Sequence, residues 1–204
     1  MYIVKTPNIL QPIVSDLLWT VHTFDKTLYL TFDDGPTPEV TERTLDLLHQ
    51  YEAKATFFCL GKNVEAFPSI YKRLIDEGHT IGNHTFDHPN GRKSNHYHYL
   101  KNIVRAEEFI QSKYFRPPYG QITRAQIQAL KKRYRIVMWD IITGDFDQNI
   151  SPEKIIKNVL DNVQSGSIIV LHDSLKAAPR MLPALEQLLP ILKSQGYTFA
   201  ALPD

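Results

Sequence analysis

Short apolar runs alternate with amphipathic stretches along most of the chain. The runs are short enough to be buried strands, and the stretches between them repeat apolar residues at helical spacing. The pattern predicts strands over 27–33, 54–59, 79–83, 114–116, 135–142, 167–172 and 197–201. It predicts helices over 39–51, 63–77, 97–112, 122–133, 152–164 and 179–195.

Repeated strand–helix alternation predicts parallel strands joined by right-handed crossovers. About seven such units favour an α/β fold, either a small (β/α) barrel, complete or incomplete, or an open doubly wound sheet. Both folds place their chemistry at the C-terminal ends of the strands. The longest stretch without periodicity, residues 85–96, is expected to be a loop over that face.

The composition indicates one domain over residues 1–204, with residues 1–26 as an N-terminal extension packed on it. The formal net charge of +1, from 23 basic and 22 acidic residues, gives no support for a nucleic-acid partner. Cys59 is the single cysteine, which excludes an internal disulfide. It lies in an apolar run and is expected to be a buried structural thiol.

No segment approaches the roughly 20 apolar residues of a membrane helix. The N-terminus contains one lysine, prolines and an aspartate, and therefore lacks a clear signal-peptide core. We expect a cytoplasmic protein without a membrane span, and leave open the export of a trimmed precursor.

Two adjacent acids, Asp33 and Asp34, follow the apolar strand 27–33. Burying a carboxylate without a partner is costly, and neighbouring carboxylates repel each other. The sequence must therefore supply groups that compensate both acids.

His84 and His88 follow the strand at 79–83. On a helical turn their spacing would put both imidazoles on one side, where two neutral histidines and one carboxylate could bind a divalent cation. The alternative is a pair of unrelated surface histidines, because short motifs often occur by chance.

Arg116 stands at another strand end, before a turn fixed by Pro117 and Pro118. Its guanidinium could keep ionised whichever of the two acids does not bind the cation, or it could be a surface cation. His172 follows four apolar residues at 168–171. A histidine there is either structural or, because that strand end faces the active side of a parallel sheet, catalytic.

Four segments in order resemble the motifs of one family: TFDDGP at 31–36, HTFDH at 84–88, RPPYG at 116–120 and VLH at 170–172. The chain resembles the polysaccharide deacetylases of the NodB-homology type, carbohydrate esterase family 4. The resemblance implies a distorted (β/α) barrel. It also implies a divalent metal, most often zinc and sometimes cobalt or nickel, and hydrolysis of N-acetyl groups on amino sugars.

By position, the resemblance implies that Asp34, His84 and His88 hold the metal. The implied catalytic groups are Asp33 as general base, Arg116 as its partner, His172 as general acid and the backbone N–H of Tyr119 as an oxyanion donor. The expected substrates are N-acetylated glycans of peptidoglycan or chitin type. The alternatives are an O-acetyl esterase, a metal-free amide or imide hydrolase, and a catalytically weak carbohydrate-binding homologue.

The fourth family motif, usually Asp-x-x-Asp-Trp, is altered here. Residues 142–146 place Ile142 at the first Asp and Phe146 at the Trp. His172 is therefore expected to lack its usual carboxylate partner. Asp140 could substitute, since residues two apart on a strand face the same side, and Asp145 could be structural.

Three further histidines and a tryptophan are expected outside the chemistry. His96 and His98 fit a solvated loop-to-helix junction, His79 a structural role, and Trp139 core packing.

Overall fold

The structure, a computed structural model, describes residues 2–7 and 15–203. Its strands are β1 Leu17–Leu18, β2 Thr27–Asp33, β3 Thr56–Cys59, β4 Thr80–Asn83, β5 Tyr114–Phe115, β6 Arg135–Val137, β7 Ile141–Ile142, β8 Ile168–His172 and β9 Thr198–Phe199. Its helices are α1 Val40–Gln50, α2 Gly61–Ala66, α3 Pro68–Asp76, α4 His96–Ala106, α5 Arg124–Leu130, α6 Pro152–Leu160 and α7 Ala178–Ser194, with a short 3-10 helix at Pro118–Gly120.

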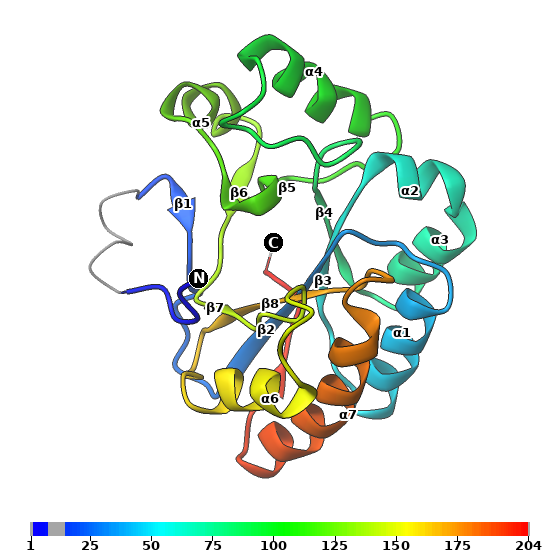
Figure 1. Ribbon diagram of the computed structural model, residues 1–204, viewed down its shortest axis with the longest axis vertical. Coiled ribbons are helices and arrows are strands. Elements are labelled where there is room, and N and C mark those ends of the chain that lie inside the picture. The colour runs from blue at the N-terminus through cyan, green and yellow to red at the C-terminus, as the bar shows by residue number, and fades with distance from the viewer. Residues whose placement is uncertain (1, 8–14, 204) are drawn as a thin grey trace.

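The strands form one parallel sheet in the order β1-β6-β5-β4-β3-β2-β8-β7, and β9 pairs with the start of β2. The sheet curls round an interior and the helices surround it (Figure 1). The prediction of a distorted, incomplete (β/α) barrel is therefore confirmed. None of the described helices has the length and apolar character needed to cross a bilayer.

N-terminal residues lie along the two ends of the curled sheet. The Met138 N–H donates to the Leu18 carbonyl at 2.7 Å, beside β6. The Ile142 N–H donates to the Val4 carbonyl at 2.9 Å, beside β7. Segments from before β2 thus extend the backbone pairing at both ends of the sheet.

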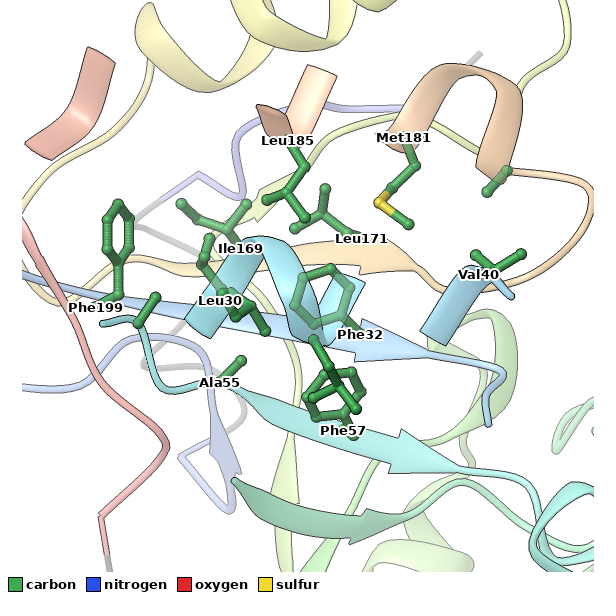
Figure 2. Packing of buried hydrophobic residues seen from close by; sticks show 14 of the residues in the cluster. Leu30, Phe32, Val40, Ala55, Phe57, Ile169, Leu171, Met181, Leu185 and Phe199 are labelled. Carbon is green, nitrogen blue, oxygen red and sulfur yellow. The ribbon is translucent and has the colours of Figure 1, made fainter. Parts of the chain in front are cut away.

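Side chains alternate between the two faces of each strand, as the period of two requires. In β2, Leu30 and Phe32 face the helices and pack with Met181 and Leu185 of α7 (Figure 2). Cys59 lies in the same buried layer, as expected, and burial raises the pKa of its thiol well above the usual value.

The interior of the barrel is filled by side chains rather than open. The buried residues in it are Tyr29, Phe58, Tyr114, Val137, Ile168 and Leu202. Leu202, near the C-terminus, is tied to the sheet by its N–H, which donates to Thr56 Oγ1 at 2.9 Å. Open space for chemistry is therefore left at the C-terminal ends of the strands.

Two predicted elements are divided in the structure. The run 135–142 forms β6 and β7, which lie beside β5 and β8 respectively, so residues 138–140 cross from one end of the sheet to the other. The helix expected over 63–77 is interrupted at Phe67, because Pro68 disfavours the helical conformation of the residue before it.

Candidate metal centre and active site

Four of the predicted site residues lie at C-terminal strand ends. Asp33 and His172 are the last residues of β2 and β8 and are partners in the sheet register. His84 directly follows β4, and Arg116 directly follows β5. The parallel order of these strands brings all four side chains to one end of the barrel.

Arg116 and Asp33 form a buried ion pair. Arg116 Nη1 donates to Asp33 Oδ1 at 2.6 Å and to Thr31 Oγ1 at 2.8 Å. The guanidinium also lies 4.1 Å from the centre of the Phe58 ring. Arg116 is 0% exposed, so it is a buried partner of Asp33 and not a surface cation.

A glycine makes room for that arrangement. A Cβ at Gly82 would lie 2.2 Å from the Phe58 ring, which real structures do not tolerate. Gly82 therefore leaves room for the Phe58 ring, on which the Arg116 guanidinium lies.

Asp34, His84 and His88 form a set that could hold a metal ion. Their ligand atoms all lie within 4.8 Å of one another. Asp34 Oδ1 is 3.2 Å from His88 Nε2 and 3.7 Å from His84 Nε2. His84 Nδ1 lies 2.8 Å from the Arg116 carbonyl oxygen, so this nitrogen donates its proton there and leaves the Nε2 lone pair directed at the site.

The protonation states of this set fit a cation. Burial lowers the pKa of His84 to about 4, which keeps the imidazole neutral. Burial favours a higher pKa for Asp34, but the contact with His88 and the charges of His172 and His84 outweigh it and hold the pKa below the usual range. Asp34 Oδ1 is buried and accepts no hydrogen bond from the described residues, which a bound cation would remedy.

The turn that carries the two histidines is not helical, so the helical explanation of their spacing is wrong. Thr85 and His88 have positive φ angles of 72° and 69°. The His88 N–H donates to Thr85 Oγ1 at 3.1 Å, and the Thr85 N–H donates to Asn83 Oδ1 at 2.8 Å. This tight turn brings the imidazole centres of His84 and His88 to 5.1 Å.

The peptide unit between Asp34 and Gly35 is held at both polar groups. Asn63 Nδ2 donates to its carbonyl at 2.7 Å, and its N–H donates to Asp173 Oδ1 at 3.1 Å. Asp34 has a φ of 81°, a conformation unfavourable for a residue with a Cβ, so these bonds stabilise it. No sequence pattern indicates Asn63, and Asp173 is marked only by its position after His172.

His172 has a carboxylate partner, and it is Asp145. Asp145 Oδ1 lies 2.8 Å from His172 Nδ1, and Asp145 Oδ2 accepts from the His172 N–H at 2.7 Å. Burial favours a lower pKa for His172, but the charge and hydrogen bond of Asp145, with the charges of Asp34 and Asp33, raise it to about 10. The expectation that His172 lacks a partner is wrong.

Asp140 is engaged elsewhere, so the suggestion that it substitutes is also wrong. Its Oδ2 accepts from Lys5 Nζ at 2.6 Å and from Ser167 Oγ at 2.5 Å. The chain leaves strand geometry after Ile142 and turns at Gly144, whose φ is 87°. That turn brings the Asp145 carboxylate to His172. An extended continuation of the strand would not place it there.

A cavity of about 520 Å³ lies at the C-terminal ends of these strands. It is lined by Tyr2, Asp33, Asp34, His84, His88, Pro117, Tyr119, Gly120, Trp139, Ile142, Phe146, Val170, His172, Ser174 and Lys176. Trp139 is therefore a wall of the cavity and not only a core residue, whereas His96 and His98 are exposed at the start of α4.

Residues 20–134 match the polysaccharide deacetylase family. The chain belongs to that family. A Bacillus cereus protein named peptidoglycan-N-acetylglucosamine deacetylase is 42% identical over 86% of this chain and 66% of its own length. A chitooligosaccharide deacetylase of Azorhizobium caulinodans is 34% identical over 87% of this chain and 93% of its own length. A crystal structure of a peptidoglycan N-acetylglucosamine deacetylase with an N-hydroxybenzamide compound superposes with a TM-score of 0.86, at 39% identity over 92% and 91% of the two chains.

In this polysaccharide deacetylase fold, Tyr119 stands at the rim of the cavity. It is 61% exposed, has a φ of 60°, and its ring packs edge-on against His88 at 4.5 Å. The N–H groups of Gly120 and Gln121 close the turn by donating to the carbonyls of Pro117 and Pro118. The ring of Tyr119 thus covers one side of His88 in the Asp34–His84–His88 set.

Proposed function

We propose that this protein is a metal-dependent hydrolase that removes N-acetyl groups from amino-sugar glycans of peptidoglycan or chitin type. The observation that carries the proposal is that one cavity contains a carboxylate and an imidazole, each held in place by a buried, oppositely charged partner. Asp33 is held by a buried arginine, His172 is held by a carboxylate, and the Asp34–His84–His88 set lies in the same cavity. The names of the relatives point to the same glycan substrates.

Asp34, His84 and His88 would hold the metal. Two imidazole nitrogens and one carboxylate suit zinc and leave further positions open, with cobalt and nickel as alternatives. When bound, such a cation supplies Lewis acidity, which polarises an amide carbonyl and lowers the pKa of water.

Asp33 is the general base. Arg116 occupies its Oδ1, so Oδ2 is the atom that accepts the proton of the attacking water. The ion pair limits the rotation of Asp33, because the guanidinium is itself held by Thr31 and by the Met138 carbonyl at 2.9 Å.

His172 is the general acid. An amine is a poor leaving group until it is protonated, and a pKa raised to about 10 keeps His172 protonated at neutral pH. Asp145 holds Nδ1, so Nε2 is the atom that delivers the proton to the departing nitrogen. The backbone N–H of Tyr119, on the cavity rim, is the candidate donor to the oxyanion.

The experiment is acetate release by chelator-treated protein, with and without added Zn²⁺ or Co²⁺. N-acetylglucosamine oligomers, peptidoglycan fragments and acetylated xylan are offered in parallel, with Asp33→Asn as the control that retains the metal ligands. We expect metal-restored release from the amino-sugar substrates and none from Asp33→Asn. Release from xylan alone would replace the amide substrate by an ester, and no release with metal still bound would overturn the proposal.

A further inference from the structure

The N-terminal residues 2–6 lie antiparallel along the segment 139–142. The Ile142 N–H donates to the Val4 carbonyl at 2.9 Å, and the Thr6 N–H donates to the Asp140 carbonyl at 2.8 Å. Thr6 Oγ1 also donates to the Trp139 carbonyl at 2.9 Å. The segment they cover contains Trp139 and Ile142, two walls of the cavity.

The Lys5 side chain holds this N-terminal segment in place. Its ammonium group donates to Asp140 Oδ2 at 2.6 Å and to the Asn162 carbonyl at 2.9 Å. Asp140 is 0% exposed, so the charge of Lys5 compensates a buried carboxylate. The position of the residues before Lys5 is therefore set by a buried ion pair in addition to backbone pairing.

On the N-terminal side of Lys5, the Tyr2 side chain lines the cavity. Its ring lies 5.1 Å from the Phe146 ring at an angle of 59°, and the Phe146 ring lies 5.5 Å from the His172 imidazole. A Cβ at position 144 would lie 2.1 Å from the Tyr2 hydroxyl oxygen, so Gly144 leaves the space that Tyr2 occupies. Phe146 thus stands between the N-terminal tyrosine and the proposed general acid.

Tyr2 is half-buried, lines the cavity, and its hydroxyl forms no hydrogen bond within residues 2–7 and 15–203. A tyrosine with an unpaired hydroxyl and an aromatic face suits a sugar ring, which presents hydroxyls at its edge and C–H groups on its face. We propose that Tyr2 is a specificity-determining residue that contacts the sugar ring of the substrate. The N-terminal segment then contributes one residue, Tyr2, to the substrate site. This inference rests on the proposed glycan deacetylase function.

The test measures binding separately from turnover. In the zinc-loaded full chain carrying Asp33→Asn, which prevents hydrolysis, the Kd for an N-acetylglucosamine tetramer is measured by calorimetry with and without Tyr2→Ala. We expect Tyr2→Ala to weaken binding by about 5- to 20-fold and Tyr2→Phe by about 2- to 5-fold, since the first removes the ring and the second removes only the hydroxyl. Ile3→Ala is the matched control, because Ile3 is the next residue of the same segment and is 68% exposed; its Kd should stay within twofold.

A Kd for Tyr2→Ala within twofold of the parent, or no measurable binding by the parent, overturns the inference. So does an equal loss of turnover by Tyr2→Ala with Asp33 intact, on the tetramer and on 4-nitrophenyl acetate, an ester without a sugar, because that result would place the effect of Tyr2 on Phe146 and His172. Weakened binding together with no acetate release by the unsubstituted protein would support the Tyr2 contact and overturn the proposed reaction instead. Zinc content and melting temperature of each variant show that the fold is retained.

Discussion

Asp145 holds His172 with both carboxylate oxygens, one on the imidazole Nδ1 at 2.8 Å and one on the backbone N–H at 2.7 Å. These two contacts fix the orientation of the imidazole, and the charge of Asp145 raises the pKa of His172 to about 10. The ring that faces the cavity is therefore protonated at neutral pH. The proposed role of His172 as an acid therefore depends on Asp145, a residue of the turn that follows β7.

Asp145→Asn should lower the pKa of His172, because it removes the negative charge that raises it. Activity that needs the protonated ring is lost as the pH rises through this pKa, so the alkaline limb of the kcat/KM profile should move to lower pH by about 1–3 units. The control is Asp147→Asn, whose carboxylate bonds to Asn149. An unchanged alkaline limb in Asp145→Asn would show that His172 is not the acid.

Removing one proposed metal ligand should abolish tight metal binding. In His84→Ala, the remaining Asp34 and His88 supply only two ligand atoms, and we expect zinc affinity to fall by more than about a hundredfold. Zinc retained after gel filtration, measured by mass spectrometry, gives the result. His98→Ala changes an exposed histidine and should retain zinc fully; equal retention in both variants would remove His84 from the metal site.

Arg116→Lys should destabilise the protein although the charge is kept. Lysine cannot reproduce the bonds to Asp33, Thr31 and the Met138 carbonyl or the stacking on Phe58, and the buried carboxylate would be incompletely paired. We expect the free energy of unfolding in denaturant to fall by roughly 2–4 kcal/mol. Arg135→Lys, at an exposed position of β6, should stay within about 0.5 kcal/mol of the parent.

Lys5→Met should also destabilise the protein, by roughly 2 kcal/mol, because it leaves the buried Asp140 carboxylate without its counter-charge. Lys157→Met is the comparison, since its partner Asp161 is on the surface and the two side chains are 65% and 53% exposed. Such a pair contributes less than about 1 kcal/mol. Similar losses in the two variants would show that the Lys5–Asp140 pair is not a buried anchor.

His79 should make the protein acid-sensitive. Burial lowers the pKa of His79 from 6.5 to about 4, and its Nδ1 accepts the Ala55 N–H at 3.1 Å. As the pH falls, the unfolded chain takes up this proton first, so the stability that the neutral ring contributes is lost between about pH 6.5 and 4.

The variant His79→Gln removes that proton uptake. The parent should lose up to roughly 3 kcal/mol of unfolding free energy relative to this variant across the interval. Denaturant titrations at pH 7 and pH 4 measure the difference, with the exposed His98→Gln as control. Parallel pH dependences in parent and His79→Gln would contradict the lowered pKa.

The sequence predicted the strands that end in Asp33 and His172 and the strand that precedes His84. A short run compatible with a strand, followed by polar residues, marks both a strand and its end. Charge compensation indicated Arg116 as a partner for one of the two acids, and the family resemblance assigned it to Asp33. These inferences depend on local pattern and on the rule that parallel strands end at one edge.

The partner of His172 could not be predicted in the same way. Treating 135–142 as one strand and continuing its alternation led to Asp140, whereas the chain ends β7 at Ile142 and turns at Gly144. The contact of Tyr2 with Phe146 joins residues far apart in the sequence, and no local pattern indicates it. Turn geometry and the docking of a terminal segment depend on the assembled barrel.

Gly82, Asp33 and His172 all belong to strands whose inward and outward positions alternate without interruption. A single-residue insertion or deletion inside β2 or β8 would rotate the terminal side chain from the cavity into the apolar layer beneath the helices. Side chains in the loops after these strands do not alternate in this way, so a change in loop length does not reverse their direction. Natural or engineered variants of this protein should therefore differ in length in the loops around the cavity, while the strands keep their residue count.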